Sequence, residues 1–452
     1  MTSDARARTG DLSANRHFLY SKTPTESGSS HSGEPPLPIL PSEEDDPLRR
    51  SFPDLHTGAQ YFEWAAAKAA PHRLFTALAL RIDTTARRYV DDHERVRQLR
   101  QEAAEAIERA CVQENGSWGL MAPDTFGCIL TGKDVASSLA IAKKLQEQLN
   151  TTAGLTLTIG LAGFPCLKYT PSDVLLNARK ALDHASFLGP GGRACFDAVS
   201  LNISGDRCYD AGEIDNAIQE FRNALRLDAQ NVNVLNSLGV CFGVRQDYAK
   251  ALTAFQAALK INPEEMLALY NAGLVHLLME QPDKALACWL KAAPLGKDVF
   301  ELNFQAGKLL IETGRPEKGQ KLIQRAARLK PDSAVVQRYL GDAFRMQRLL
   351  EDAIPPYKKA LRLHPNDAHA LSGLGRCYDL RNENLDIALA FCRQSVDITP
   401  DNGRFHMRLG RLLGKTGQYD EALKAFKQAE SLGIDAREAI TAIEERCVDK
   451  AS

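Results

Sequence analysis

The sequence predicts a multidomain protein in which an α/β sandwich is followed by an all-α superhelical solenoid, with a disordered tail at the N-terminus. Three observations lead to this prediction. Residues 1–57 are rich in serine, proline and charge and have no helical or strand period, so they cannot bury enough apolar surface to become ordered. Residues 58–197 alternate between strand and helix patterns. Over residues 198–436, small residues recur about every 34 positions, which is the period of a helical repeat.

Composition excludes several classes of protein. The 452 residues include 56 basic and 57 acidic side chains, and this balance argues against a protein that coats nucleic acid. No apolar run approaches the roughly 18 residues that cross a bilayer, and the N-terminus lacks the apolar core of a secretory signal. We therefore expect a cytoplasmic protein whose partners include no nucleic acid and no membrane.

The ten cysteines form no CxxC pair, and neither they nor the ten histidines have the spacing of metal ligands. We expect free core thiols, no metal and no cofactor. Within the tail, residues 36–40 read PLPIL and are followed after Pro41 by the acidic run SEEDD. This stretch is a candidate docking segment, and a plain linker is the alternative.

The α/β domain is predicted from local patterns. The apolar run 74–82 has the length of a buried strand, and a helix over 84–112 carries one apolar stripe. Strands at 117–121 and 126–131 flank a hairpin tip at 122–125. A helix at 136–149, a strand at 155–162, a helix at 172–187 that ends at Gly189, and a short strand at 194–196 complete the order β, α, β, β, α, β, α, β.

Several segments of this domain resemble the GGDEF family of diguanylate cyclases, which condense two GTP molecules into cyclic di-GMP. The segment LTLTIGLAGFP is similar to the family's TxSxGxA strand, and the helix with Ala178, Ala181, Leu182 and Ala185 before Gly189 is similar to its ADxALYxAKxxG helix. The family's signature hairpin corresponds to five residues that keep only its third and fifth letters, namely Ala122, Pro123, Asp124, Thr125 and Phe126.

The departures from the family pattern concern its nucleotide and metal sites. Ala122 and Pro123 remove the space and one N–H donor that a glycine pair offers to the nucleotide. The resemblance implies a Mg²⁺ ligand where Arg81 stands, and a cation at that position repels the metal. Asp83 and Asp124 are retained, although turn chemistry and helix capping also explain them.

Three further family positions are changed. Ser186 and Pro190 correspond to the phosphate-binding lysine and arginine, and Tyr89 corresponds to the guanine-reading asparagine. We therefore expect a degenerate, inactive GGDEF-like domain with a regulatory or dimerising role. The alternatives are an active or residual diguanylate cyclase, and a nucleotide-binding receptor without turnover.

The solenoid region repeats three small positions and one bulky position. Glycine recurs at intervals of 34 or 35 residues, at Gly205, Gly239, Gly273, Gly307, Gly341, Gly375 and Gly410. A second small series consists of Ala217, Ala251, Ala285, Gly319, Ala353, Ala388 and Ala422. A third consists of Ala224, Ala258, Ala292, Ala326, Ala360, Ser395 and Ala429. The bulky series consists of Phe221, Phe255, Trp289, Ile323, Tyr357, Cys392 and Phe426.

Small residues at these positions allow the two helices of a hairpin to approach closely, and the bulky residues fill the remaining space. The pattern resembles the tetratricopeptide repeat (TPR) family, with seven repeats over residues 198–436. Residues 437–452 are expected to form a C-terminal capping helix and tail, because Ala439, Ile440 and Ile443 continue a helical apolar pattern.

The resemblance implies that the first helix of each repeat lines a concave groove for a peptide. In the early repeats the exposed groove positions include Asn236, Tyr270, Asn271 and Leu274. In the late repeats they include Arg338, Tyr339, Arg345, Arg376, Arg404, Arg408, Arg411 and Lys415. A cluster of like charges is tolerated when an anionic partner meets it, although a solvated basic face is the alternative.

The combined prediction is a cytoplasmic adaptor or scaffold rather than an enzyme. Its partner is expected to be a protein or peptide ligand with an acidic segment. The chain's own tail is a candidate ligand, because PLPIL with the following SEEDD matches a groove that changes from apolar to basic.

Overall fold

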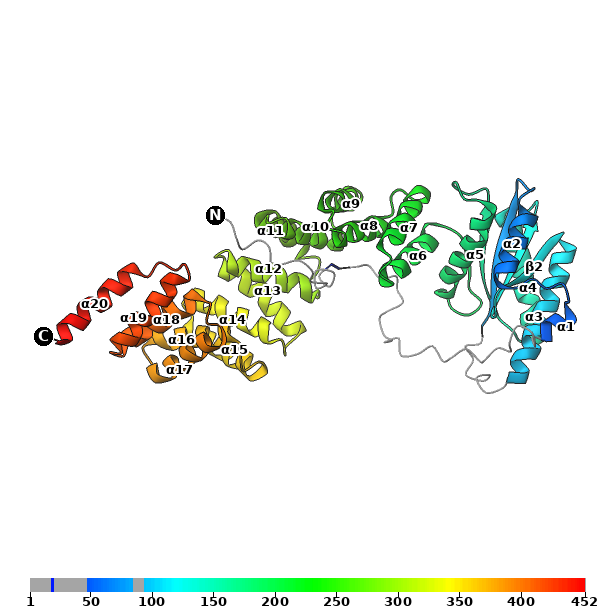
Figure 1. Ribbon diagram of the computed structural model, residues 1–452. Helices are drawn as coiled ribbons and strands as arrows, with labels where there is room; N and C mark the ends of the chain where they lie inside the picture. Colours follow the sequence, from blue (N-terminus) through cyan, green and yellow to red (C-terminus); the bar gives the residue numbers. More distant parts are fainter. Residues whose placement is uncertain (1–17, 20–46, 84–92, 452) are drawn as a thin grey trace. The chain divides into compact units, whose positions relative to one another are not determined.

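The computed structural model describes residues 18–19, 47–83 and 93–451 (Figure 1). The described chain divides into two compact units, residues 18–263 and residues 264–451, and each is treated by itself. None of the described helices is long and apolar enough to span a membrane.

The first unit contains a five-stranded mixed sheet in the order β2-β3-β1-β4-β5. Its strands are β1 (Phe75–Ile82), β2 (Gly116–Ala122), β3 (Thr125–Thr131), β4 (Leu157–Phe164) and β5 (Arg193–Cys195). The central strand β1 is antiparallel to both β3 and β4, and only β5 pairs in parallel, with β4. The element order from β1 to β5 agrees with the prediction.

Helices cover both faces of this sheet. They are α2 (Gly58–Ala69), α3 (His93–Gln113), α4 (Val135–Ala153) and α5 (Pro171–Ser186). Leu78 and Leu80 of β1 pack toward α3 and α4, whereas Ala77 and Ala79 pack toward α2 and α5. Successive residues of a strand point to opposite faces, and β1 is apolar on both because both are covered.

Small residues form a row across one face of the sheet. Gly119 pairs with Gly127, Gly127 with Ala79, and Ala79 with Gly160. A Cβ on Gly127 would lie 2.5 Å from the ring of Tyr61, so this aromatic side chain of α2 rests on the backbone of β3. A Cβ on Gly160 would collide with the backbone of α5. The row therefore sets how closely α2 and α5 approach the sheet.

The structure corrects the expected start of this domain. Residues 1–57 were expected to form a disordered tail, but α1 (Pro47–Ser51) falls within them, and Leu48 is 2 % exposed. Phe52 and Leu55 pack against the same core cluster as Leu48. These apolar residues belong to the domain because they cover its sheet and helices, which a search for local periodicity cannot detect. The expected docking segment, residues 36–46, lies outside the described residues.

The described part of the helix predicted over 84–112 is α3 (His93–Gln113), and residues 84–92 lie outside the described residues. Local capping defines two of the other helices. Asp134 accepts a hydrogen bond from the backbone N–H of Ser137 at the start of α4. Thr170 and Asp173 form a capping box at the start of α5.

From Ala198 onward the described chain consists of seven helix pairs and one final helix. In the first unit the pairs are α6 (Ala198–Asp210) with α7 (Ile214–Leu227), and α8 (Val232–Val244) with α9 (Tyr248–Ile261). In the second unit they are α10 (Met266–Leu278) with α11 (Pro282–Ala292), α12 (Phe300–Glu312) with α13 (Pro316–Leu329), α14 (Ala334–Met346) with α15 (Leu350–Leu363), α16 (Ala368–Arg381) with α17 (Leu385–Ile398), and α18 (Gly403–Lys415) with α19 (Tyr419–Ser431). The final helix is α20 (Arg437–Ala451).

The packing inside each pair confirms the interpretation of the repeated positions. In all seven pairs the bulky residue of the second helix lies directly on the glycine of the first. A Cβ on Gly341, for example, would lie 2.8 Å from the ring of Tyr357. Ala258 and Ala360, from the third small series, are completely buried. The prediction succeeded because these contacts join residues only about 16 positions apart within one hairpin.

Helix α20 packs against the last pair. Ile443 is 5 % exposed, and Ala439 and Ile440 contact the same apolar cluster. A Cβ on Gly414 of α18 would lie 2.9 Å from Cδ1 of Ile443. The expected capping helix is therefore present and covers the terminal repeat.

Candidate partner-binding face of the repeats

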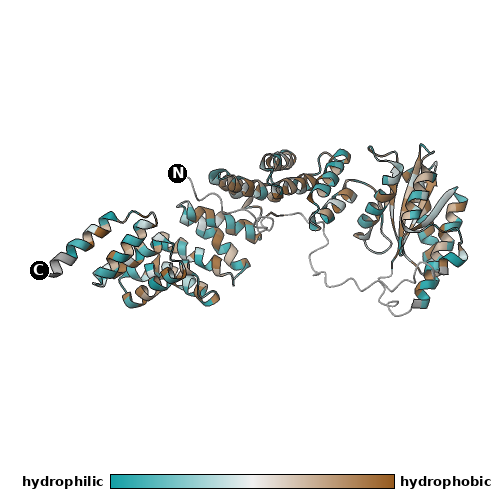
Figure 2. Ribbon diagram, viewed as in Figure 1, coloured by the Kyte–Doolittle hydropathy of each residue, from teal (hydrophilic) through white to brown (hydrophobic). Residues whose placement is uncertain are grey.

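The early residues expected to be exposed in a groove are buried. Asn236, Tyr270, Asn271 and Leu274 are 1 %, 0 %, 0 % and 5 % exposed. Figure 2 shows that α8 and α10, which carry them, are mostly hydrophobic. Tyr270 stacks with Trp289, and the Trp289 indole N–H donates to the backbone carbonyl of Tyr270 at 2.9 Å. The prediction that these side chains are available to a ligand is wrong, because they form part of the packing between helices.

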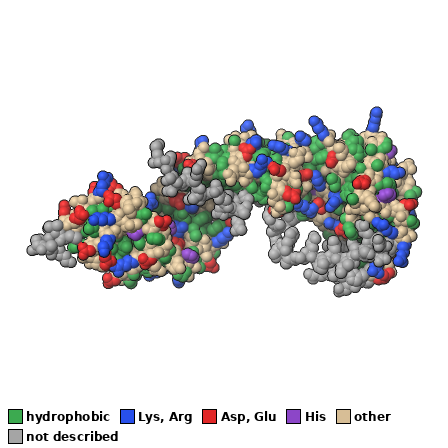
Figure 3. All heavy atoms as spheres, in the orientation of Figure 1, with side chains coloured by type: hydrophobic (Ala, Val, Ile, Leu, Met, Phe, Trp, Pro, Cys, Tyr) green, Lys and Arg blue, Asp and Glu red, His purple; other side chains and the backbone are tan. Residues whose placement is uncertain are grey.

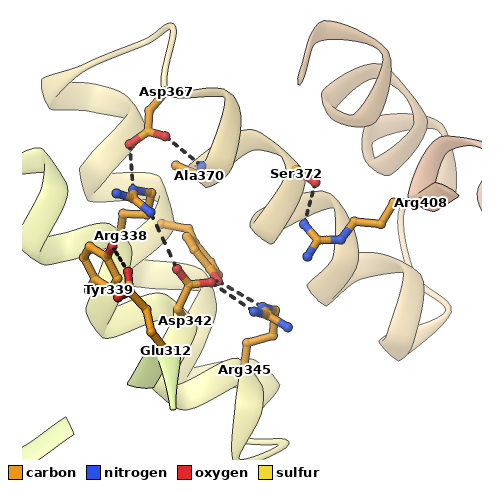
Figure 4. Close-up of polar contacts among 10 residues, drawn as sticks. Glu312, Arg338, Tyr339, Asp342, Arg345, Asp367, Ala370, Ser372 and Arg408 are labelled. Carbon is orange, nitrogen blue, oxygen red and sulfur yellow. Dashed lines mark hydrogen bonds and ion pairs between the residues drawn. The ribbon is translucent and has the colours of Figure 1, made fainter. Parts of the chain in front are cut away.

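In the later repeats, the inner helices α14, α16 and α18 bring most of the expected cations together. We call the surface formed by Arg338, Asp342, Arg345, Asp367, Ser372, Arg376, Asp379, Arg404, Arg408, Arg411 and Lys415 the inner-helix face. Figure 4 shows its central part, with side chains from α14 and α18 pointing toward α16. Tyr339 is turned elsewhere: it is 8 % exposed, and its hydroxyl donates to Glu312 at 2.7 Å.

Asp342 neutralises part of this face. Its Oδ1 accepts from Nη2 of Arg345 at 3.0 Å and from the hydroxyl of Tyr357 at 2.6 Å. Arg338 lies 3.3 Å from Asp367, the N-cap of α16, and 3.9 Å from Asp342 (Figure 4). Burial by itself would lower the pKa of the Arg345 guanidinium. The interactions with Tyr357 and Asp342 have the larger combined effect, so the pKa is raised.

Asp379 performs the same role for two further cations. It pairs with Arg376 one helical turn earlier in α16, and its Oδ1 lies 2.7 Å from Nζ of Lys415 in α18. Figure 3 shows acidic and basic side chains interspersed over the visible surface of the repeats. The expectation of an uncompensated basic cluster is thus corrected, because four of its seven cations have carboxylate partners from the same face.

The three remaining cations have no carboxylate partner among the residues that the structure describes. Arg404 and Arg411 are exposed. Arg408 is only partly exposed, and its one hydrogen bond within the described chain goes to the hydroxyl of Ser372, at 2.6 Å (Figure 4). Burial and the neighbouring Arg345 lower the pKa of Arg408, so its surroundings disfavour the positive charge.

Sequence reasoning missed the carboxylates of this face. Asp342 follows Arg338 by four residues, and Asp379 follows Arg376 by three, which places each pair on one side of its helix. This spacing could have shown that part of the basic face is neutralised. Nothing local could have shown that Arg408 reaches Ser372, because 36 residues separate them.

In the α/β domain, Asp83 and Asp124 form hydrogen bonds within the fold. Asp83 accepts from the hydroxyl of Thr158 at 2.6 Å and from the backbone N–H of Gly191 at 2.7 Å. Asp124 accepts from Thr125 at 2.9 Å. No group of three or more potential metal ligands occurs in the part of the chain that the structure describes. Tyr89 falls in an undescribed stretch.

Arg81 and Ser186, two of the positions that differ from the GGDEF pattern, contact each other. Nη2 of Arg81 donates to the hydroxyl of Ser186 at 2.7 Å, and this hydroxyl in turn donates to the backbone carbonyl of Leu182. At the expected hairpin, Ala122 pairs with Thr125, Pro123 and Asp124 form the tip, and Phe126 is buried in the core. The hairpin is confirmed as a structure, without any feature that identifies a ligand.

Comparison with known proteins identifies the repeats. Three family models of the tetratricopeptide repeat match the chain. The first matches residues 242–298, 304–368 and 351–403, the second matches residues 205–243, and the third matches residues 403–432. The chain therefore contains TPR repeats over most of its C-terminal half. No curated protein matches the chain in a sequence comparison.

Solved structures, some of them described as those of TPR proteins, match parts of the chain. A structure of YrrB, described as a TPR protein with an unusual peptide-binding site, is 21 % identical, with a TM-score of 0.38, and covers 40 % of this chain and 93 % of its own. A TPR protein from Parabacteroides merdae is 16 % identical, with a TM-score of 0.37, and the match covers 54 % of this chain and 96 % of that protein's chain. PilF from Pseudomonas aeruginosa is 16 % identical, with a TM-score of 0.39, and the match covers 48 % of this chain and 97 % of the PilF chain.

Proposed function

We propose that this chain, whose C-terminal half carries TPR repeats, is an adaptor that binds an acidic segment of a partner protein on its inner-helix face. One observation carries the proposal. Arg408 holds a guanidinium in partly buried surroundings, beside Arg345, with only a neutral hydroxyl as its hydrogen-bond acceptor within the described chain.

A carboxylate from a ligand would satisfy this guanidinium better than Ser372 does. A buried charge without an ionic partner is unfavourable, and a carboxylate can accept two parallel hydrogen bonds from one arginine. Asp342 is not free to do so, because Arg345 and Tyr357 already donate to it. Binding an acidic residue at Arg408 would therefore relieve an unfavourable charge in addition to forming new contacts.

The flanking cations favour an acidic run over a single acidic residue. Arg404 and Arg411 are exposed on the same helix, three or four residues from Arg408. Exposed charges of this kind contribute mainly to the rate of association and to its salt dependence. Neighbouring packed helices lie about 10 Å apart, so an extended segment of about six residues would cross from α14 to α18.

The test uses the full chain with its own acidic run neutralised by Glu43→Gln, Glu44→Gln, Asp45→Asn and Asp46→Asn. A fluorescein-labelled PLPILPSEEDDP peptide should bind at low salt and bind more weakly at high salt. Arg408→Met should weaken binding at least about tenfold, the value of one hydrogen bond between charged groups. Lys424→Met, on the outer helix α19, serves as the matched control and should have no effect.

Two outcomes would contradict the proposal. One is equal affinity for this peptide and its amide counterpart PLPILPSQQNNP, and the other is unchanged affinity in Arg408→Met. The same titration tests whether the tail occupies the face in the unaltered chain. If it does, the labelled peptide binds the unaltered chain more weakly than the neutralised one, because the tethered segment competes.

We further propose that the α/β domain is a non-catalytic regulatory or dimerising module. The observation that supports this is the hydrogen bond from Arg81 to Ser186. Arg81 stands where the GGDEF pattern has a metal-binding acid, and Ser186 stands where the pattern has a lysine that binds phosphate. Both carboxylate oxygens of Asp83 are also engaged, by Thr158 and by Gly191.

Incubation of the full chain with GTP and Mg²⁺ should give no cyclic di-GMP above an enzyme-free blank. Calorimetric titration should detect no Mg²⁺-dependent GTP binding, because the positive charge of Arg81 repels a metal ion from this position. Product formation would instead support the enzyme alternative. Tight GTP or cyclic di-GMP binding without turnover would support the receptor alternative.

A further inference from the structure

The N-terminal segment contributes an aromatic contact to the repeats of the first unit. Phe18 is 8 % exposed, and the adjacent Leu19 is half-buried. A Cβ built on Gly243 of α8 would lie 2.5 Å from Cζ of Phe18 and 2.8 Å from its Cε1. The tip of the Phe18 ring therefore lies on the backbone of α8, where a larger residue would leave no room.

Gly243 is not explained by the packing inside its own repeat. The repeat glycine of α8 is Gly239, and Phe255 of α9 lies on that residue. A glycine inside a helix is unfavourable compared with alanine, because it loses more backbone freedom on folding. Position 243 comes four residues after the repeat glycine, and the corresponding residues of the other repeats are Tyr209, Leu277, Ile311, Arg345, Asp379 and Gly414.

The second glycine at this register, Gly414, also receives a side chain from outside the repeats. Ile443 of the capping helix α20 lies on it, with Cδ1 2.9 Å from the position that a Cβ would occupy. Both glycines at this register thus accept an apolar side chain from a segment that flanks the solenoid. At Gly414 the contacting segment is the capping helix α20, whereas at Gly243 the described contact is made by Phe18.

We propose that Gly243 marks a binding site for an aromatic side chain on the inner helix of the second repeat, and that Phe18 with Leu19 is its intramolecular ligand. The covalent link gives the ligand an effective concentration near the millimolar range, so an external aromatic segment binds the site only when Phe18 and Leu19 do not occupy it. Its chemistry is apolar and differs from the charged chemistry proposed for Arg408. The two sites can therefore be tested separately.

The test uses a fluorescent LSANRHFLYSKTP peptide, which reproduces residues 12–24 and contains no acidic residue. It should bind the full chain carrying Phe18→Ala and Leu19→Ala, and should bind the unaltered chain at least about tenfold more weakly, because the tethered ligand competes. Adding Gly243→Leu to the double variant should abolish binding. Ala249→Leu, which adds the same side chain at an exposed position of α9, is the matched control and should leave binding unchanged.

A second measurement follows the segment in the absence of peptide. Trypsin can cut at Arg16 and Lys22, on either side of Phe18, and cleavage should be slower in the unaltered chain than in Gly243→Leu. Equal cleavage rates, equal peptide binding by the unaltered chain and the double variant, or no binding by the double variant would overturn the proposal. Protection that increases with protein concentration would assign the site to a second copy of the chain, and would also overturn it.

Discussion

Replacing Gly160 by alanine is expected to destabilise the α/β domain by about 3 kcal/mol or more, at the upper end of the range for overpacked cores. The added Cβ would collide with backbone atoms of Ala178, Ala181 and Leu182 in α5. A helix backbone cannot rotate away as a side chain can, so α5 must move as a whole. Its buried residues Val174, Ala178 and Leu182 would then lose their contacts with the sheet.

Hydrogen exchange of the β1 and β4 amides in the full chain measures this loss, because a thermal midpoint of a multidomain protein mixes several transitions. Gly163→Ala is the control on the same strand. Its Cβ would meet only the side chain of Val135 and should cost less than about 1 kcal/mol, because that side chain can change rotamer. Similar costs for the two variants would mean that the approach of α5 is not limited at Gly160.

Replacing Asp342 by alanine is expected to destabilise the repeats around α14 and α16 by about 3 kcal/mol, since removal of one partner leaves the other charge uncompensated in partly buried surroundings. Arg345 and Tyr357 would both lose their acceptor. The charge of Arg345 already lowers the pKa of Arg408, and without Asp342 both guanidinium groups would lose a nearby negative charge. Because each repeat contacts mainly its neighbours, exchange should accelerate in α14 to α17 more than in the other repeats.

Asp283→Ala is the matched control, because Asp283 is 91 % exposed and lies 4.0 Å from Arg315. A surface pair of this kind should change stability by less than about 0.5 kcal/mol. Combining Asp342→Ala with Arg345→Met should restore part of the loss, because it removes the unpaired charge. A further loss in the double variant would show that the cost comes from packing and not from electrostatics.

Prediction from sequence was most successful where structure depends on neighbours along the chain. The strands around Ala77 and Ile159, and the helix containing Ala178, were found because each has its own period and its own end signals. Helices α1 and α2 were missed. Tyr61 of α2 is placed by Gly119 and Gly127, which become neighbours only when β2 pairs with β3.

The candidate site was less predictable than the fold. The sequence predicted Arg338, Arg345, Arg376, Arg408 and Lys415 as positions of one groove, and whether this surface binds a partner stays a prediction. It did not indicate that Asp342, Asp367 and Asp379 would neutralise four of these five cations, or that Tyr270 would be buried against Trp289. The sequence of one helix shows which charged residues it carries. Which cation meets which carboxylate of another helix depends on the side-chain directions in the folded solenoid.

The sequence by itself determined the helical repeats and the contact inside each pair, because a glycine and the bulky residue about 16 positions later meet through helix geometry alone. Only the tertiary structure decided which groups are left without a partner. Arg408 meets Ser372 from the preceding repeat, and Phe18 meets Gly243 across more than 200 residues of chain. Such contacts depend on how successive repeats stack and where a flanking segment lies, and no local period in the sequence encodes either.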